Sequence, residues 1–266
     1  MEKATNLLNL TMAVMASISL SVFCSCTKDE PSQQKEQLQE VTDSLRTALG
    51  AQLDKTIPSM SILIQTAQET YFVCSAAPGE QMITPETYFR FASNTKNFTA
   101  VAILNMHEDG WLDYRAKITD TIPGSSIPYV PLTGEWNIPN KNIITIEQLL
   151  QHSAGVYDVD NDSVPGLGGS SYVSYTLNQN PNHQFTSSEL VSQVVIHNLR
   201  YSFDPGKGHH YSNTGFTILG EIIARVYSFR AGSAKTYSDY LYDHIYGPST
   251  PVPLQVHFPY LATDQI

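Results

Sequence analysis

The chain has 266 residues, of which 41% are hydrophobic and 15% charged, a composition typical of a sizeable folded domain and not of a disordered chain. Its formal net charge is −10, and no long run of Lys and Arg occurs. These features exclude the basic surface by which proteins bind nucleic acid, so we expect no nucleic-acid partner.

The N-terminus has the pattern of a bacterial lipoprotein signal over residues 1–26. Its apolar run, Leu7 to Phe23, is too short and too rich in Ser and Thr for a membrane-spanning helix, although a single membrane anchor is the alternative. The small Ser25 before Cys26 is similar to a lipobox. We expect Cys26 to be lipidated and the chain to be exported to the bacterial cell envelope. Cys24 is the alternative, because Phe23 stands where that signal prefers an aliphatic residue.

Residues 27–108 predict a tether, a helix, a hairpin and a second helix. The tether is charged and Gln-rich, the helices have apolar residues at helical spacing, and the strands are β-rich runs separated by three residues. Asp109-Gly110 is expected to end the second helix. The predicted elements are a tether over 27–36, a helix over 37–55, strands over 59–66 and 70–76, and a helix over 93–108.

Residues 113–185 are rich in Pro, Gly, Ser, Asn and Tyr and predict mostly irregular structure. One short helix is expected near 144–152, where Thr145 and Gln148 have the spacing of a capping box. Beyond this region the helical pattern returns, and helices are expected over 187–199, 215–227 and 237–245. Strands followed by helices predict an α/β domain over 37–266.

Ser93 and Lys96 stand three residues apart where a loop turns into the helix over 93–108, which places their side chains on one helical face. The unpaired N–H groups of a helix start favour a developing alkoxide, so the pair predicts a serine nucleophile with a lysine base. Two further Ser-x-x-Lys matches, beginning at Ser25 and Ser32, fall in the signal and the tether. The alternative is that Ser93 only caps the helix and that Lys96 is solvated.

Tyr211 and Asn213 form the only Tyr-x-Asn in a chain with 15 tyrosines, in a loop directly before a predicted helix. A loop tyrosine can shuttle a proton, and an amide two residues on can bind a substrate carbonyl and a lysine ammonium. The alternative is a tyrosine that packs in a turn beside an asparagine that helps cap the helix. His209 and His210 predict no metal site, because adjacent side chains do not converge on one ion. The three cysteines predict no disulfide framework and no zinc site.

With their flanks, these two motifs resemble the serine β-lactamase and penicillin-binding-protein superfamily, in particular its class C β-lactamase, D,D-carboxypeptidase and esterase branch. The matching segments keep the family's order from about residue 45 onward. They are Phe89-Arg-Phe-Ala-Ser-Asn-Thr-Lys96, Ile146-Glu-Gln-Leu-Leu-Gln-His-Ser-Ala-Gly155, Pro205-Gly206 and Tyr211-Ser-Asn-Thr-Gly215. The resemblance implies an α/β (α+β) fold of the β-lactamase/transpeptidase type, a sandwich of antiparallel sheet and helices with an α-helical subdomain.

The resemblance also implies roles for the site residues. Ser93 is expected to be the acylated nucleophile, Lys96 its base or proton relay, Tyr211 the partner proton shuttle and Asn213 a substrate-orienting residue. His152 is expected to have a structural role, ordering residues 153–158. No cofactor is implied.

The implied reaction is attack of Ser93 on an amide, β-lactam or ester carbonyl of a small-molecule or peptidoglycan-like substrate. The family's third motif, Lys-Thr-Gly or His-x-Gly on a strand, does not follow Asn213. We therefore expect the C-terminal strands and half of the oxyanion hole to lie outside these 266 residues. The alternative functions are an inactive, truncated homologue that at most binds peptidoglycan or penicillin, and a purely structural surface lipoprotein.

Overall fold

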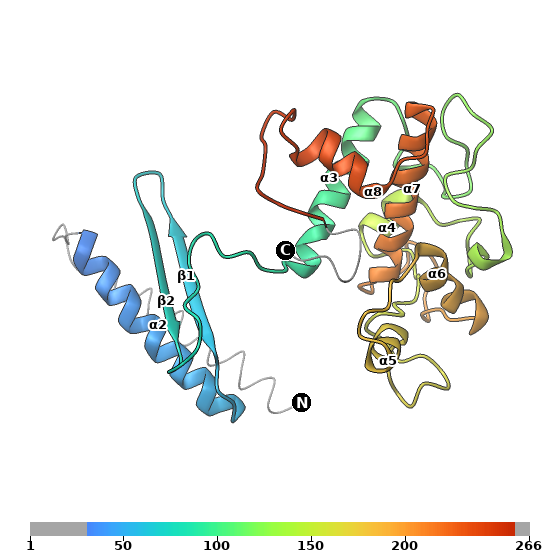
Figure 1. Cartoon of the computed structure of the whole chain (residues 1–266). Helices are drawn as coiled ribbons and strands as arrows, with labels where there is room; N and C mark the ends of the chain where they lie inside the picture. Colours follow the sequence, from blue (N-terminus) through green and yellow to red (C-terminus); the bar gives the residue numbers. More distant parts are fainter. Residues whose placement is uncertain (1–30, 259–266) are drawn as a thin grey trace. The chain divides into compact units, whose positions relative to one another are not determined.

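The computed structural model of this chain describes residues 31–258, which form one unit up to Tyr88 and a second unit from Phe89 onward (Figure 1). The expected lipoprotein signal, with Cys24 and Cys26, lies outside the described residues. None of the described helices combines the length and apolar character needed to cross a membrane. A single hydrolase domain over 37–266 stays a prediction.

The first unit is one helix, α2 (Pro31–Leu53), against a hairpin of β1 (Ser59–Gln65) and β2 (Thr70–Ala76). The strands are antiparallel, with Ser59 opposite Ala76 and Gln65 opposite Thr70, as the β-rich runs predicted. In the connecting turn, the Thr66 hydroxyl accepts hydrogen bonds from the N–H groups of Gln68 and Glu69.

Residues 31–36, which the sequence analysis assigned to the tether, are helical and belong to α2. The sequence explains this, because the Gln, Lys and Glu residues of this segment are good helix formers. Residues 27–30 of the tether lie outside the described part.

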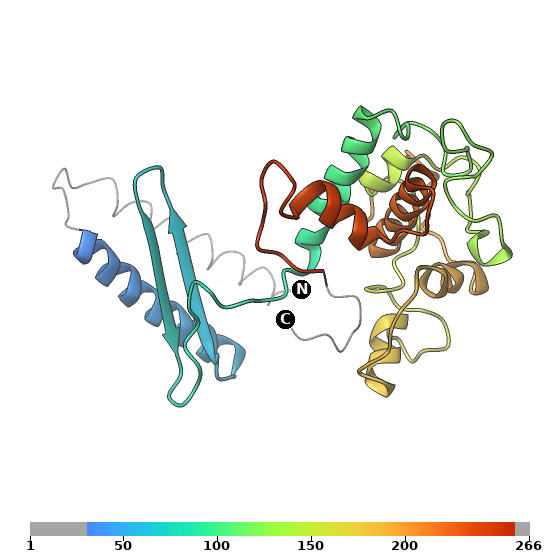
Figure 2. The same ribbon diagram turned by 45° about the horizontal axis from the view of Figure 1, so that its top comes forward.

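The second unit is built around one long helix, α7 (Asn213–Ala231), which contacts helices from four other parts of the chain. These are α3 (Thr95–Glu108), α4 (Ile146–Leu150), α6 (Ser187–Ile196) and α8 (Tyr237–Leu241), and Figures 1 and 2 show them around α7. The inward face of α7 consists of fully buried aliphatic residues, which are Ile218, Leu219, Ile222, Ile223 and Val226. Burial of five such side chains makes α7 the centre of the core.

The region between α3 and α6 is mostly irregular, as predicted. Hydrogen bonds and buried side chains connect it to the helical core. The capping box of Thr145 and Gln148 is present at the start of α4. Trp136 is buried, and its indole N–H donates to the Ser188 hydroxyl in α6. One helix here, α5 (Tyr172–Gln179), was not predicted, and its start is capped by the hydroxyl of Ser171.

Most helix boundaries agree with the predictions to within a few residues. The helix over 93–108 is a 3₁₀ turn, η1 (Ala92–Asn94), followed directly by α3. The helix over 187–199 ends earlier, at Ile196, whereas α8 continues into a π-helical turn, η3 (Tyr242–Tyr246). A second 3₁₀ turn, η2 (Gly134–Trp136), lies in the irregular region. The mixture of helices with an antiparallel sheet agrees with the predicted α/β class.

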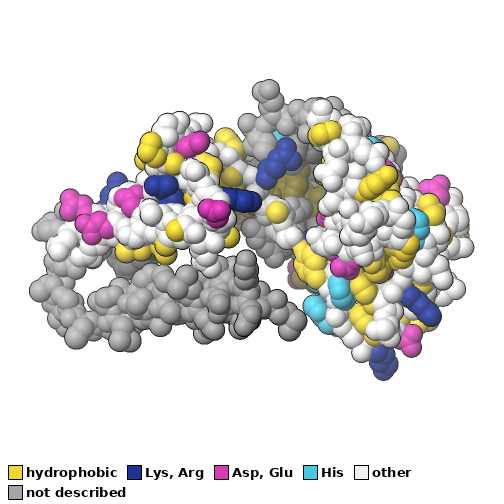
Figure 3. All heavy atoms as spheres, turned by 90° about the horizontal axis from the view of Figure 1, so that it is seen from below, with side chains coloured by type: hydrophobic (Ala, Val, Ile, Leu, Met, Phe, Trp, Pro, Cys, Tyr) yellow, Lys and Arg dark blue, Asp and Glu magenta, His cyan; other side chains and the backbone are white. Residues whose placement is uncertain are grey.

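The molecular surface carries charges of both signs. In the face that Figure 3 shows, Lys, Arg, Asp and Glu side chains are scattered among hydrophobic and uncharged ones, and no continuous basic area is visible there.

Candidate active site

Ser93 lies in the η1 turn that leads into α3, and its side chain is exposed. The preceding residue, Ala92, has φ of 44°, a left-handed conformation that costs a non-glycine residue of order 1 kcal/mol. Asn94, and not Ser93, is the N-cap of α3, and it makes no side-chain capping bond. Ser93 therefore does not serve as a helix cap. The exposed Ser93 side chain follows directly on the strained backbone of Ala92.

Ser93 Oγ has two polar partners from different parts of the chain. Tyr211 Oη lies 2.6 Å away, and Lys96 Nζ, one helical turn further along α3, donates to Ser93 Oγ at 3.4 Å. One hydroxyl is thus in contact with two groups that can accept or return its proton, which is the arrangement of an activated nucleophile.

Lys96 is half-buried between an amide and two aromatic rings. Its Nζ donates to Asn213 Oδ1 and lies 4.7 Å from the ring centroid of Tyr211 and 5.4 Å from that of Phe216. These contacts hold the ammonium beside Ser93 by a hydrogen bond and by cation–π attraction, so Lys96 is not a solvated surface lysine.

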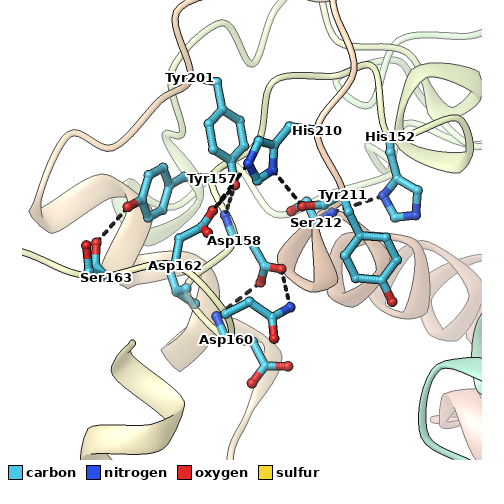
Figure 4. Close-up of polar contacts among 12 residues, drawn as sticks. His152, Tyr157, Asp158, Asp160, Asp162, Ser163, Tyr201, His210, Tyr211 and Ser212 are labelled. Atoms are coloured by element: carbon cyan, nitrogen blue, oxygen red, sulfur yellow. Dashed lines mark hydrogen bonds and ion pairs between the residues drawn. The ribbon is translucent and has the colours of Figure 1, made fainter. Parts of the chain in front are cut away.

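Tyr211 is held from both sides by His152. The His152 carbonyl accepts from the His210 N–H, and His152 Nδ1 accepts from the Ser212 N–H, each at 3.0 Å. The imidazole also packs on the Tyr211 ring, with centroids 4.5 Å apart, and Figure 4 shows the two rings side by side. His152 therefore positions the tyrosine in addition to any effect on residues 153–158.

His152 must be neutral to accept this hydrogen bond, because the protonated ring is a donor at both nitrogens. Burial lowers the pKa of His152, and the nearby charges of Lys96 and His209 lower it further, whereas Asp158 acts in the opposite direction. The neutral imidazole that the Ser212 N–H requires is therefore favoured.

Asn213 is the first residue of α7 and bridges Lys96 to an acidic residue. Its Nδ2 donates to Asp160 Oδ2 at 2.8 Å, while its Oδ1 accepts from Lys96. Burial, followed by the charge of Asp158, raises the pKa of Asp160, and Lys96 and Asn213 act against this shift. Ser93, Lys96, Tyr211, Asn213 and Asp160 thus form one connected chain of polar contacts.

The loop that carries Asp160 is fixed by a polar network on its far side (Figure 4). The buried Asp158 accepts from the Asp160 N–H and from Asn161 Nδ2. Tyr201 donates its hydroxyl hydrogen to Asp162 and accepts from the Asp158 N–H, and burial together with Asp162 raises its pKa. These bonds occupy Asp158 and Asp162, whereas Asp160 lines a cavity that Ser93 also lines.

A cavity of about 630 Å³ opens over these groups and is lined by Ala92, Ser93, Lys96, Asp160, Asn161, Tyr211 and Asn213. A second cavity, of about 920 Å³, lies along α3 and α7 and shares Lys96, Asp160 and Asn213 with the first. The space next to the serine is large enough for a small acyl group and its leaving group.

Within residues 31–258, no three His, Cys, Asp or Glu side chains form a group that could hold a metal ion. The adjacent pair of histidines takes separate partners. His210 stacks on Tyr201 with ring centroids 3.8 Å apart, and His209 lies edge-on to His152.

The structure brings together all four residues that the two motifs nominated, Ser93, Lys96, Tyr211 and Asn213. It adds Asp160, which sequence reasoning missed, and it gives His152 a contact with the Tyr211 segment that was not foreseen. The alternation of Asp158, Asp160 and Asp162 after Gly155 is the signal that could have drawn attention to the loop. The expected lipidation site, Cys26, lies outside the described residues.

Comparison with known families gives a match over most of the chain. A family model described as Beta-lactamase matches residues 39–253. Penicillin-binding protein 4* of Bacillus subtilis (strain 168) is 26% identical over 179 residues, which is 67% of this chain and 32% of that protein. Protein flp of Staphylococcus aureus (strain MW2) is 27% identical over 161 residues, 60% of this chain and 26% of that protein. The chain thus spans about a third or less of these two relatives.

Solved structures show the same fold. A D-stereospecific amidohydrolase from Streptomyces sp. is similar with a TM-score of 0.54 and 22% identity, covering 77% of this chain and 53% of that one. The D-amino acid amidase of Ochrobactrum anthropi SV3 has a TM-score of 0.54 and 24% identity, covering 79% and 48%. A class C β-lactamase mutant has a TM-score of 0.51 and 17% identity, covering 79% and 48%. These likenesses confirm the predicted β-lactamase/transpeptidase-like fold.

Proposed function

This chain belongs to the Beta-lactamase family, and we propose that it is a serine hydrolase that acts on amide, β-lactam or ester carbonyls through an acyl-serine intermediate. One observation carries the proposal: Ser93 Oγ is in contact with both Tyr211 Oη, at 2.6 Å, and Lys96 Nζ, at 3.4 Å. A helix-capping or solvated serine needs neither partner.

In the proposed reaction, Ser93 Oγ attacks the carbonyl carbon, and its proton passes to the unprotonated amine form of Lys96, directly or through the Tyr211 hydroxyl. The carbonyl oxygen becomes an oxyanion, and the Ser93 N–H, which donates to no acceptor among the described residues, is available to bind it. The carbon–nitrogen or carbon–oxygen bond then breaks, and the leaving group takes up this proton from Lys96 through the Tyr211 hydroxyl. Water next attacks the acyl-serine and gives one proton to the same groups, which pass it to Ser93 Oγ as the bond between the acyl carbon and Ser93 Oγ breaks.

The substrates that we propose are small molecules or peptidoglycan-like peptides. The names of the relatives support this range, because they include a penicillin-binding protein, a D-stereospecific amidohydrolase and a D-amino acid amidase. The cavity beside Ser93 is of a size for such acyl groups.

We further propose that the chain works in the bacterial cell envelope as a lipoprotein anchored through Cys26. The support is the sequence of residues 1–26, in which an apolar run leads to Ser25-Cys26. A substrate of the cell wall would then be within reach of the enzyme.

The proposal is tested by intact mass spectrometry after incubation with a penicillin and with 4-nitrophenyl acetate. We expect one acyl adduct per chain, and no adduct on the Ser93→Ala variant. Tyr211→Phe removes the proton-shuttling hydroxyl and should slow acylation by roughly 10²- to 10⁴-fold. Tyr175→Phe, which removes the hydroxyl of a tyrosine of similar overall exposure on α5, should acylate like the wild type.

Lack of any adduct, or equal labelling of the Ser93→Ala variant, would contradict the proposal. Cooperative unfolding of an unlabelled chain would then favour the inactive homologue as the better description.

A further inference from the structure

A single carboxylate faces the same cavity as the nucleophile. Among the seven residues that line the 630 Å³ cavity, Asp160 is the only acidic one and Lys96 the only basic one. Both charges are half-buried, so their fields are screened less than those of exposed groups. A ligand bound at Ser93 therefore meets the Asp160 carboxyl group, whose pKa burial raises while Lys96 and Asn213 act in favour of the carboxylate.

Asp160 is held rigidly in this position from both sides. The Val159 N–H donates to Thr214 Oγ1, a buried hydroxyl next to Asn213, and the Asp160 N–H donates to Asp158 Oδ1, each at 3.1 Å. The backbone of the loop is thus tied to the start of α7, the helix that also carries Asn213. A charge fixed in this way needs no reorganisation when it binds a ligand.

One oxygen of Asp160 is engaged and the other is open. Oδ2 accepts from Asn213 Nδ2 at 2.8 Å, whereas Oδ1 accepts no hydrogen bond from any residue that the structure describes. The Asn213 amide also separates the two charges, because Lys96 is bonded to its Oδ1 and Asp160 to its Nδ2. The open oxygen can therefore accept from a cationic donor on the substrate.

We infer that Asp160 is a specificity-determining residue that selects acyl groups with a protonated amino group on the carbon next to the scissile carbonyl. This inference rests on the proposed function of Ser93. Such an ammonium is two bonds from the carbon that Ser93 attacks, so it enters the cavity that both residues line. Its charge-assisted hydrogen bond to Asp160 has no counterpart for a neutral acyl group.

The test compares two nearly isosteric substrates at pH 7, alanine 4-nitroanilide and isobutyric acid 4-nitroanilide, in which a methyl replaces the ammonium. Both enantiomers of the alanine compound are used. Asp160→Asn keeps an oxygen that can accept from Asn213 but removes the charge. We expect it to lower kcat/KM for the cationic substrate by about 10- to 100-fold, the effect of losing a charged hydrogen bond, and that for the neutral one by less than about threefold.

Glu108→Gln is the matched control, because it makes the same change of charge at an exposed position of α3. It should leave both rates unchanged. A second measurement does not require turnover: alaninamide should protect Ser93 from acylation by 4-nitrophenyl acetate at a lower concentration than isobutyramide, and Asp160→Asn should abolish the difference.

Equal losses on both substrates would overturn the inference, because they would show that Asp160 only positions Asn213. Equal protection by the two amides would do the same. These failures are distinct from failure of the proposed function, which would appear as the absence of Ser93-dependent acylation by the neutral ester.

Discussion

At the scale of the residue, His152 shows how a neighbouring side chain can hold a candidate catalytic residue, Tyr211, in place. It has φ of 55°, a left-handed conformation that is uncommon outside glycine and asparagine. This conformation accompanies the two hydrogen bonds by which its carbonyl and its ring nitrogen hold the residues on either side of Tyr211. The strain at His152 thus belongs to the geometry of the site.

This arrangement predicts a dependence on pH. Because the folded chain lowers the pKa of His152, the unfolded chain takes up the proton first as the pH falls. The contribution of neutral His152 to the free energy of unfolding is therefore complete at pH values above its pKa in the unfolded chain, about 6.5. This contribution is lost as the pH falls through the lower pKa of His152 in the folded chain. His152→Asn keeps an acceptor near the Nδ1 position, tolerates the positive φ and does not titrate.

Denaturant unfolding and Ser93 acylation, measured from pH 8 to pH 5, check this prediction. The wild type should lose stability and acylation rate more steeply than the variant below about pH 6.5. The groups that act on the imidazole are Lys96, His209 and Asp158, with the Tyr211 ring packed against it. Identical pH profiles for the two proteins would show that His152 does not titrate in this range.

At the scale of the element, the residues at the start of α7 both stabilise the helix and position the residues of the candidate site. The Ser212 hydroxyl caps the helix by accepting from the Gly215 N–H at 3.0 Å, and it is buried. Ser212 lies between Tyr211 and Asn213, so one cap fixes the backbone on both sides of it. Sequence reasoning expected the helix to begin at Gly215, whereas it begins at Asn213.

Ser212→Ala should therefore lower the free energy of unfolding by about 1 kcal/mol and also slow acylation of Ser93 by at least about tenfold. Ser171→Ala is the matched control, because Ser171 is a buried N-cap of α5 that accepts from the Ser174 N–H in the same way. Ser171→Ala should lower the free energy of unfolding, measured in urea, by a similar amount and should leave the rate of Ser93 acylation unchanged. Equal effects of both variants on acylation would contradict a local role for the α7 cap.

At the scale of the whole molecule, the described residues divide into a helix-and-hairpin unit and a helical unit, and every member of the candidate site belongs to the second. The family match spans both, from residue 39 to residue 253. The helical unit has its own core around α7. The assembly of the candidate site therefore depends on the packing of α3, α4 and α7 and of the loops between them.

Export and anchoring also concern the whole chain. If Cys26 is the lipidated residue, Cys26→Ser should abolish incorporation of labelled palmitate and release the protein from the membrane fraction of bacterial cells. Cys24→Ser should leave both unchanged, which makes it the matched control. The opposite pattern would assign the lipid to Cys24, and labelling of both variants would rule out a single anchor at either residue.

Much of the fold was predictable because its signals are local. Apolar spacing located the long helices and the hairpin, and the Thr145 and Gln148 pair marked the start of α4. The helix α5 was missed because its residues are largely polar and none of them is buried, so no apolar stripe reveals it. The first turns of α2 were missed because a charged, Gln-rich segment is compatible with both a helix and a tether.

The sequence by itself determined the family and nominated Ser93, Lys96, Tyr211 and Asn213, because each motif is a short pattern at a helix start and needs no distant partner to be seen. Only the tertiary structure decided that the motifs meet. Tyr211 contacts Ser93 across 118 positions of sequence, and Asp160 reaches Asn213 across 53. Such contacts depend on how the core packs α3 against α7 and on a loop whose bonds are non-local, and no local pattern encodes either.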